Sequence, residues 1–193
     1  MDRIKTAYEK ALERISKMNL ADVDVSSVEY IPKGGAVAAR FLRDKDFDLI
    51  AELEKYSEDV RGYVREGILE ALLRNIQLPK DEQAQDANRR AMDGLLAIKK
   101  DKRVLKQIFS ELEYLFNYYM QAVAHSYANL KESFAARITP AQQALERQLG
   151  TKVRVDVERH PGFLEEWLRA QGELDAQYEP VLSEQKEKIR RLN

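Results

Sequence analysis

Residues 104–138 place apolar side chains around so wide an arc that a helix formed by them needs neighbours on two sides. Two stripes with helical spacing run along this stretch. The first consists of Leu105, Ile108, Leu112, Leu115 and Tyr119, and the second of Phe109, Phe116, Met120, Val123, Tyr127, Leu130 and Phe134. The pattern predicts a long central helix in a helical bundle. The side chains that we expect to be nearly fully buried are Leu112, Leu115, Phe116, Tyr119 and Val123.

Four further stretches have helical periodicity and supply partners for the central helix. They cover residues 2–18, 47–76, 80–98 and 163–192. The first has a heptad seam of Ile4, Tyr8, Ala11, Ile15 and Met18, and the last has a seam of Leu164, Trp167, Gln171, Leu174, Tyr178 and Val181. Pro180 should kink or break the last helix, because a proline inside a helix removes a backbone hydrogen bond.

Two stretches alternate apolar and polar residues, which is the pattern of a half-buried strand. They are residues 22–31, which precede a proline and two glycines, and residues 152–157, which carry three alternating valines. Because a single strand leaves its backbone groups unpaired, we expect the two stretches to pair. The predicted fold class is therefore mainly α: an elongated helical bundle with a long central helix and a small two-stranded β element. It forms a single helical domain over residues 1–193, with sub-units 1–138 and 139–193 as an alternative.

The stretch from Ile138-Thr139-Pro140 through Leu149-Gly150-Thr151 to Asp156-Val157 resembles the helix, glycine and strand near the C-terminus of the δ subunit of rotary ATP synthases. Ala7-Tyr8-Glu9-Lys10-Ala11-Leu12 is similar to the first helix of that subunit. The resemblance covers less than a quarter of the chain. It implies, as an alternative function, a peripheral subunit of such an enzyme.

Charge and composition exclude several classes of function. The chain has 32 Lys and Arg against 33 Asp and Glu, so it lacks the basic excess that is typical of nucleic-acid-binding proteins. It has no cysteine, which excludes disulfides, thiolate metal sites and a thiol nucleophile. No apolar run approaches the roughly 20 residues that span a bilayer, and the first residues lack a signal-peptide core. We expect a cytoplasmic protein with no nucleic-acid partner and no membrane span.

The two histidines of the chain, His125 and His160, do not complete a recognisable catalytic or metal-binding motif. A di-metal helical bundle needs the Glu-x-x-His spacing twice, and neither histidine has a carboxylate three residues before it. No Ser-His-Asp arrangement is indicated. We therefore expect no metal, no cofactor and no enzymatic activity.

One polar face of the central helix is a candidate ligand site. Tyr114, Tyr118, Gln121, His125 and Glu132 share this face at helical spacing. One interpretation is a polar pocket in which His125 binds a small anion or moves a proton. The other is a row of amphipathic side chains at the edge of the core, with apolar bodies inside and polar tips in water.

Two short basic motifs also have two interpretations each. Lys33-Gly34-Gly35 is either a backbone nest for phosphate or a hinge between a loop and a helix. The run from Lys99 to Arg103 is interrupted by Asp101 and has no aromatic residue beside it. It either contacts phosphate or forms a solvated turn between two helices.

The function predicted from these patterns is that of a structural or protein-interaction protein. The terminal seams exceed what the bundle itself needs, and exposed apolar seams favour association. We expect a homodimer or another protein partner, joined by coiled-coil-like contacts through Ile4, Tyr8, Ile15, Leu164, Trp167, Leu174 and Tyr178. The alternative is a small-ligand-binding or sensory domain centred on the face of His125.

Overall fold

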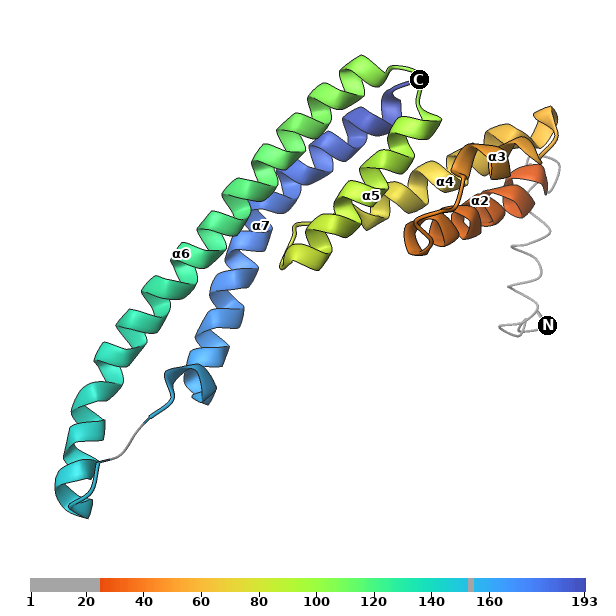
Figure 1. The fold of residues 1–193 in the computed structure, drawn as a ribbon. Coiled ribbons are helices and arrows are strands. Elements are labelled where there is room, and N and C mark those ends of the chain that lie inside the picture. The colour runs from red at the N-terminus through yellow and green to blue at the C-terminus, as the bar shows by residue number, and fades with distance from the viewer. Residues whose placement is uncertain (1–24, 153–154) are drawn as a thin grey trace, which may run out of the picture. The chain divides into compact units, whose positions relative to one another are not determined.

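The computed structural model describes residues 25–152 and 155–193, and the regular structure in these ranges is entirely helical (Figure 1). The helices are α2 (Val25–Arg43), α3 (Leu49–Glu54), α4 (Glu58–Asn75), α5 (Glu82–Ile98), α6 (Lys102–Leu149) and α7 (Pro161–Arg191), with a 3₁₀ turn η2 (Val157–Arg159) before α7. The chain divides into two compact units, Met1–Leu72 and Leu73–Asn193, with the division inside α4.

The prediction of a two-stranded β element is wrong. The part of 22–31 that the structure describes forms the first turns of α2, so it cannot pair as a strand. In the second stretch, Val155 and Asp156 are not in a strand and Val157 starts η2. Asp156 caps η2, because its carboxylate accepts a hydrogen bond from the backbone N–H of Glu158 at 3.1 Å. Residues 22–24 and 153–154 lie outside the described residues.

In the first unit, α2 and α4 cross with their backbones in contact. A Cβ atom added at Gly34 would lie 2.1 Å from the carbonyl oxygen of Val64, and one added at Gly67 would lie 2.0 Å from that of Ile31. Ala38, Val64 and Ile68 are fully buried beside this crossing. Lys33-Gly34-Gly35 lies inside α2, so the prediction of a hinge between a loop and a helix is wrong for this motif.

The stretch 47–76, expected as one helix, forms two. Asp48 caps α3 with hydrogen bonds of 3.0 Å from the N–H groups of Ile50 and Ala51. The chain turns between Lys55 and Ser57 before α4 begins.

In the second unit, α6 and α7 form an antiparallel hairpin, and α5 lies beside the N-terminal part of α6 (Figure 1). The central-helix prediction is confirmed and extended, since α6 has 48 residues, about 70 Å at 1.5 Å per residue. It continues through Pro140, and the alternative boundary between sub-units after residue 138 lies inside it. It ends at Gly150, whose positive φ of 68° closes the helix. Pro180 does not break α7.

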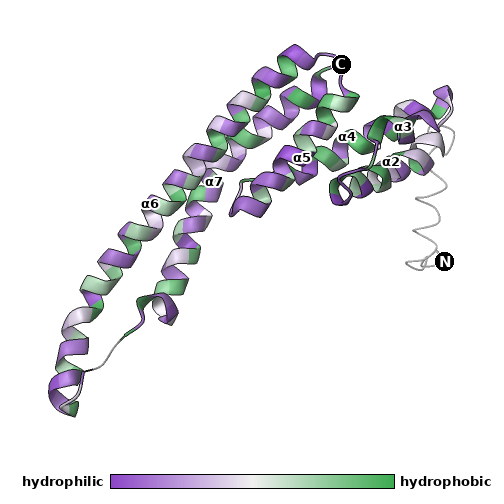
Figure 2. Cartoon of the chain, in the orientation of Figure 1, coloured by the Kyte–Doolittle hydropathy of each residue, from purple (hydrophilic) through white to green (hydrophobic). Residues whose placement is uncertain are grey.

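The core of this unit follows the apolar stripes of α6, as the hydropathy colouring in Figure 2 illustrates. Leu112, Phe116 and Tyr119 are buried as expected. Leu115 and Val123 are only half-buried, so the prediction was wrong for these two.

Candidate functional site

The seam of the α6–α7 hairpin contains a buried hydrogen bond. Tyr119 is fully buried, and its hydroxyl donates to Oδ1 of Asp175 at 2.6 Å. The ring of Tyr178 packs edge-on against that of Tyr119 at 5.4 Å between centroids. Burial, together with the carboxylate of Asp175, raises the pKa of Tyr119 to about 12. Tyr119 is therefore a neutral donor that fixes the register of the two helices.

Near η2 the seam is aromatic. Tyr127 packs edge-on against Phe163 at 5.6 Å and against Trp167 at 5.0 Å. The ring of Phe134 packs against those of Phe163 and His160, with centroid distances of 5.7 Å and 5.1 Å. His160 also caps α7, since its Nδ1 accepts the N–H of Gly162 at 3.1 Å. We refer to these five residues as the aromatic cluster.

Ion pairs border the aromatic cluster. Glu158 accepts hydrogen bonds from Lys131 at 2.6 Å and from the hydroxyl of Tyr127 at 3.0 Å. Both hydrogen bonds lower the pKa of Glu158, and the one from Lys131 has the larger effect. Arg137 and Glu166 join the two helices at 2.5 Å. These contacts attach η2 and the start of α7 to α6.

The structure separates the predicted interface residues into three groups. Trp167 and Tyr178 pack against α6 within the chain, and Leu174 is half-buried. Leu164 is 47% exposed. Ile4, Tyr8 and Ile15 lie outside the described residues.

The sequence interpretation missed Leu168, which is 67% exposed and lies one helical turn after Leu164. The signal that would have found it is the spacing of four residues between two leucines that share a helix face. We refer to Leu164 and Leu168 as the outer leucine pair.

The predicted ligand face is brought together, and it is open to solvent. Tyr114, Tyr118, Gln121, His125 and Glu132 are all exposed on α6. The hydroxyls of Tyr114 and Tyr118 are 3.2 Å apart, and this hydrogen bond raises the pKa of Tyr118. Nε2 of His125 lies 3.1 Å from Nδ2 of Asn129. Ligand binding at this face stays a prediction.

Three pockets of the second unit lie elsewhere. Two line the groove between α5 and α6, with volumes of about 170 and 480 Å³, and share Arg89, Met92 and Glu113. A third, of about 540 Å³, lies between residues 74–80 and α7. Across the described residues, no His, Asp and Glu side chains form a group of three or more that could hold a metal ion. Every described helix falls short of the length and apolar character that a bilayer-spanning helix requires.

Comparison with known proteins gives one match. A family model described as "Family of unknown function (DUF6657)" matches residues 50–191, which run from α3 to the end of α7. No curated protein and no solved structure matches the chain. Since the matched region includes most of the chain and the whole α6–α7 hairpin, the protein belongs to the Family of unknown function (DUF6657).

Proposed function

We propose that the protein is a non-enzymatic interaction protein whose α6–α7 hairpin self-associates through the outer leucine pair. The observation that supports the proposal is the exposure of Leu164 and Leu168, at 47% and 67%, on a helix whose other face packs against α6. Two leucines one turn apart on an outer helix face form a small apolar stripe, and such stripes favour contact with another helix.

Charge complementarity favours a second copy of the chain as the occupant. Glu165 and Arg169 flank the outer leucine pair on one side, and both are exposed. Arg169 also pairs with Glu173 of its own helix at 3.2 Å, and a contact with Glu165 of a second copy would exchange or share this exposed ion pair. In an antiparallel pair of α7 helices with a twofold axis near Glu166, Leu164 of one copy lies opposite Leu168 of the other. The same axis brings Glu165 of one copy within reach of Arg169 of the other, twice by symmetry. An isologous dimer requires such a self-complementary surface.

The stripe is short, so the dimer is weak. Stable interfaces bury about 1,200–2,000 Å² in total, and four leucines with their flanking charges cover less than that. We expect a dissociation constant in the micromolar range or above. The apolar contact would supply the affinity and the two charge pairs the orientation.

Sedimentation equilibrium from micromolar to submillimolar concentration tests the proposal. The wild-type chain should follow a monomer–dimer equilibrium, and Leu168→Glu should be monomeric throughout. Val181→Glu is the matched control, because Val181 is an apolar residue of α7 that is 44% exposed and lies away from the outer leucine pair. A wild-type chain that is monomeric at the highest concentration, or equal weakening by the two variants, refutes the proposal.

A charge exchange tests the orientation. Arg169→Glu alone should weaken the dimer, because it places four acidic side chains around the outer leucine pairs. Adding Glu165→Arg to the same chain should restore the affinity, since each pair is then re-formed with its charges exchanged. Failure of this rescue would exclude the antiparallel arrangement.

A further inference from the structure

The N-terminus of α6 and the C-terminus of α7 are joined at one end of the hairpin. The carbonyl oxygen of Asn193 accepts the N–H groups of Lys100 at 2.9 Å and Asp101 at 3.1 Å. The ammonium of Lys99, which is almost fully buried, donates to the carbonyl oxygens of Arg190 at 3.2 Å and of Leu192. Two chain segments that are far apart in the sequence are therefore held side by side.

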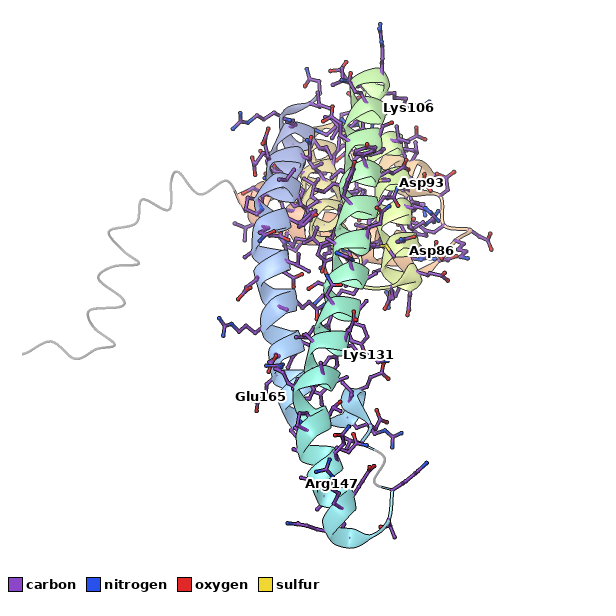
Figure 3. All side chains as sticks on the ribbon, turned by 90° about the vertical axis from the view of Figure 1, so that its left-hand side faces the viewer. Asp86, Asp93, Lys106, Lys131, Arg147 and Glu165 are labelled. Carbon is purple, nitrogen blue, oxygen red and sulfur yellow. The ribbon has the colours of Figure 1, made fainter. Side chains whose placement is uncertain are left out.

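This junction concentrates positive charge. Residues 99–106 and 186–191, which we call the basic end, contain nine Lys and Arg against two acidic residues, Asp101 and Glu187. The remainder of the chain has 23 basic against 31 acidic residues. The near-zero net charge of the chain thus conceals an uneven distribution of charge along the sequence. Figure 3 shows Lys106 near this end of the hairpin and Arg147 near the other.

Four of the nine cations are available to an outside partner. Lys100, Lys102, Arg103 and Arg191 are exposed, and within the described part of the chain they form no ion pair. Lys188 and Arg190 are paired with Glu184 and Glu187.

The composition and position of the basic end distinguish between anionic partners. It contains no aromatic residue on which bases could stack. Val104, between the cations, is 45% exposed, and a phosphate backbone offers nothing to an apolar side chain. A rod-like nucleic acid lying along the hairpin would meet residues 107–185, which have 7 basic against 12 acidic residues. A flat surface met end-on would not meet the far part of the hairpin, because α6 extends for about 70 Å, far beyond the roughly 8 Å over which salt screens charge.

We propose that the basic end binds peripherally to the surface of an anionic phospholipid bilayer. Lys100, Lys102, Arg103 and Arg191 contact the lipid phosphates, and Val104 lies at the level of the headgroups. The hairpin then projects away from the surface. This inference is independent of self-association, because the outer leucine pair lies on another part of α7.

Co-sedimentation of the full chain with lipid vesicles tests the proposal. Vesicles of phosphatidylcholine containing roughly 30% phosphatidylglycerol should bind the protein, and vesicles of phosphatidylcholine alone should not. Raising the salt concentration to about 0.5 M should release the protein, since the attraction acts within a Debye length. Absence of binding to the anionic vesicles, or equal binding to both kinds, overturns the proposal.

Two charge-reversal variants locate the surface. Lys102→Glu with Arg103→Glu should reduce the affinity by about thirtyfold or more, because each basic side chain near an anionic surface contributes about fivefold. Acidic residues in the first turn of a helix are favourable, so this variant should fold, which circular dichroism verifies. Arg147→Glu with Lys152→Glu changes the net charge equally at the other end of the hairpin and should bind normally. Equal weakening by both variants contradicts a localised site.

A third arm uses a short DNA duplex in place of vesicles at the same salt concentration. We expect weaker binding to the duplex than to the anionic vesicles. Tighter binding to the duplex, lost in the Lys102→Glu, Arg103→Glu variant, would assign the basic end to nucleic acid and overturn the proposal.

Discussion

Replacing Gly67 with alanine adds one methyl group where α4 touches α2. The new Cβ would lie 2.0 Å from the carbonyl oxygen of Ile31 and 2.9 Å from its carbonyl carbon. Both are backbone atoms, so the clash is relieved only if the helices separate. Overpacking of this kind costs about 1–3 kcal/mol, and a rigid neighbour places the cost at the upper end.

A matched control removes the effect of helix propensity. Alanine is more favourable than glycine in a helix interior by about 1 kcal/mol. A Cβ at Gly62, in the same helix, meets no atom within 4 Å, so Gly62→Ala should stabilise the protein by about 0.5–1 kcal/mol. Gly67→Ala gains the same propensity and still loses on balance. Because the propensity gain cancels, the two variants should differ in free energy of unfolding by the overpacking cost alone, about 2–3 kcal/mol.

Urea denaturation followed by circular dichroism measures the difference. The adjacent glycines of α2 repeat the test from the other side of the crossing. A Cβ at Gly34 would lie 2.1 Å from the carbonyl oxygen of Val64, whereas one at Gly35 meets nothing within 4 Å. Gly34→Ala should destabilise and Gly35→Ala should not. If all four variants are stabilised alike, the helices do not cross in backbone contact.

Three further predictions concern the second unit. The pKa of Tyr119 is about 12 in the folded chain and that of an unfolded tyrosine is near 10, so the contribution of Tyr119 to stability should be intact below pH 10. The free energy of unfolding of the wild-type chain should fall by up to about 2 kcal/mol as the pH rises towards 12. Tyr119→Phe should unfold more easily at pH 7, and its stability should lack this decrease between pH 10 and pH 12. Lys99→Met removes the hydrogen bonds of a buried ammonium and should lower the free energy of unfolding by about 1–3 kcal/mol. Lys100→Met removes an exposed ammonium and should change the free energy of unfolding little. Equal effects of the two variants would exclude the Lys99 hydrogen bonds. Leu112→Ala should cost about 3 kcal/mol or more and the half-buried Leu115→Ala clearly less, and the reverse order in urea denaturation would contradict the orientation of α6.

The central helix could be predicted because its signal is local and redundant. Two apolar stripes that run from Leu105 to Phe134 leave few alternatives to a helix buried on two sides. The loss of Leu115 and Val123 from the predicted core has a simple cause. Periodicity gives the direction of a side chain, whereas the neighbouring helix determines how completely that side chain is covered.

The start of α2 could not be predicted by the same reasoning. Its inward face contains Gly34, and an apolar-periodicity argument does not count a glycine as a core residue. The contact that stabilises this position is made by the backbone of α4 at Gly67, more than thirty residues away. Alternating valines and a diglycine therefore indicated a strand and a turn, whereas tertiary packing produced a helix.

The two candidate surfaces could be predicted from the sequence to different degrees. The heptad seam of α7 predicted Leu164, Trp167 and Tyr178 as one interface. The seam is used mainly within the chain, and the outer leucine pair lies beside it. The basic end could not be found from either segment alone. Lys99–Arg103 and Lys186–Arg191 become one surface only because Asn193 and Lys99 hold the two helix ends together.

The two proposals combine into a further prediction. In the antiparallel dimer the twofold axis lies near Glu166, about 25 residues before the end of α7. At 1.5 Å per residue, each basic end then lies about 38 Å from the axis, and the two point in opposite directions. Such a dimer has two separate lipid-binding ends, so it should bridge vesicles.

Light scattering from anionic vesicles therefore distinguishes binding of the protein to one vesicle from bridging of two vesicles by the dimer. Wild-type protein should bind the vesicles and cluster them, with clustering that increases with protein concentration because the dimer is weak. Leu168→Glu should bind with unchanged affinity and leave the vesicles dispersed, whereas Lys102→Glu with Arg103→Glu should do neither. If Leu168→Glu clusters vesicles as well as the wild type does, the bridging contact is not the outer leucine pair. If the wild type binds without clustering at concentrations where it is dimeric, the two basic ends do not point apart and the antiparallel geometry is excluded.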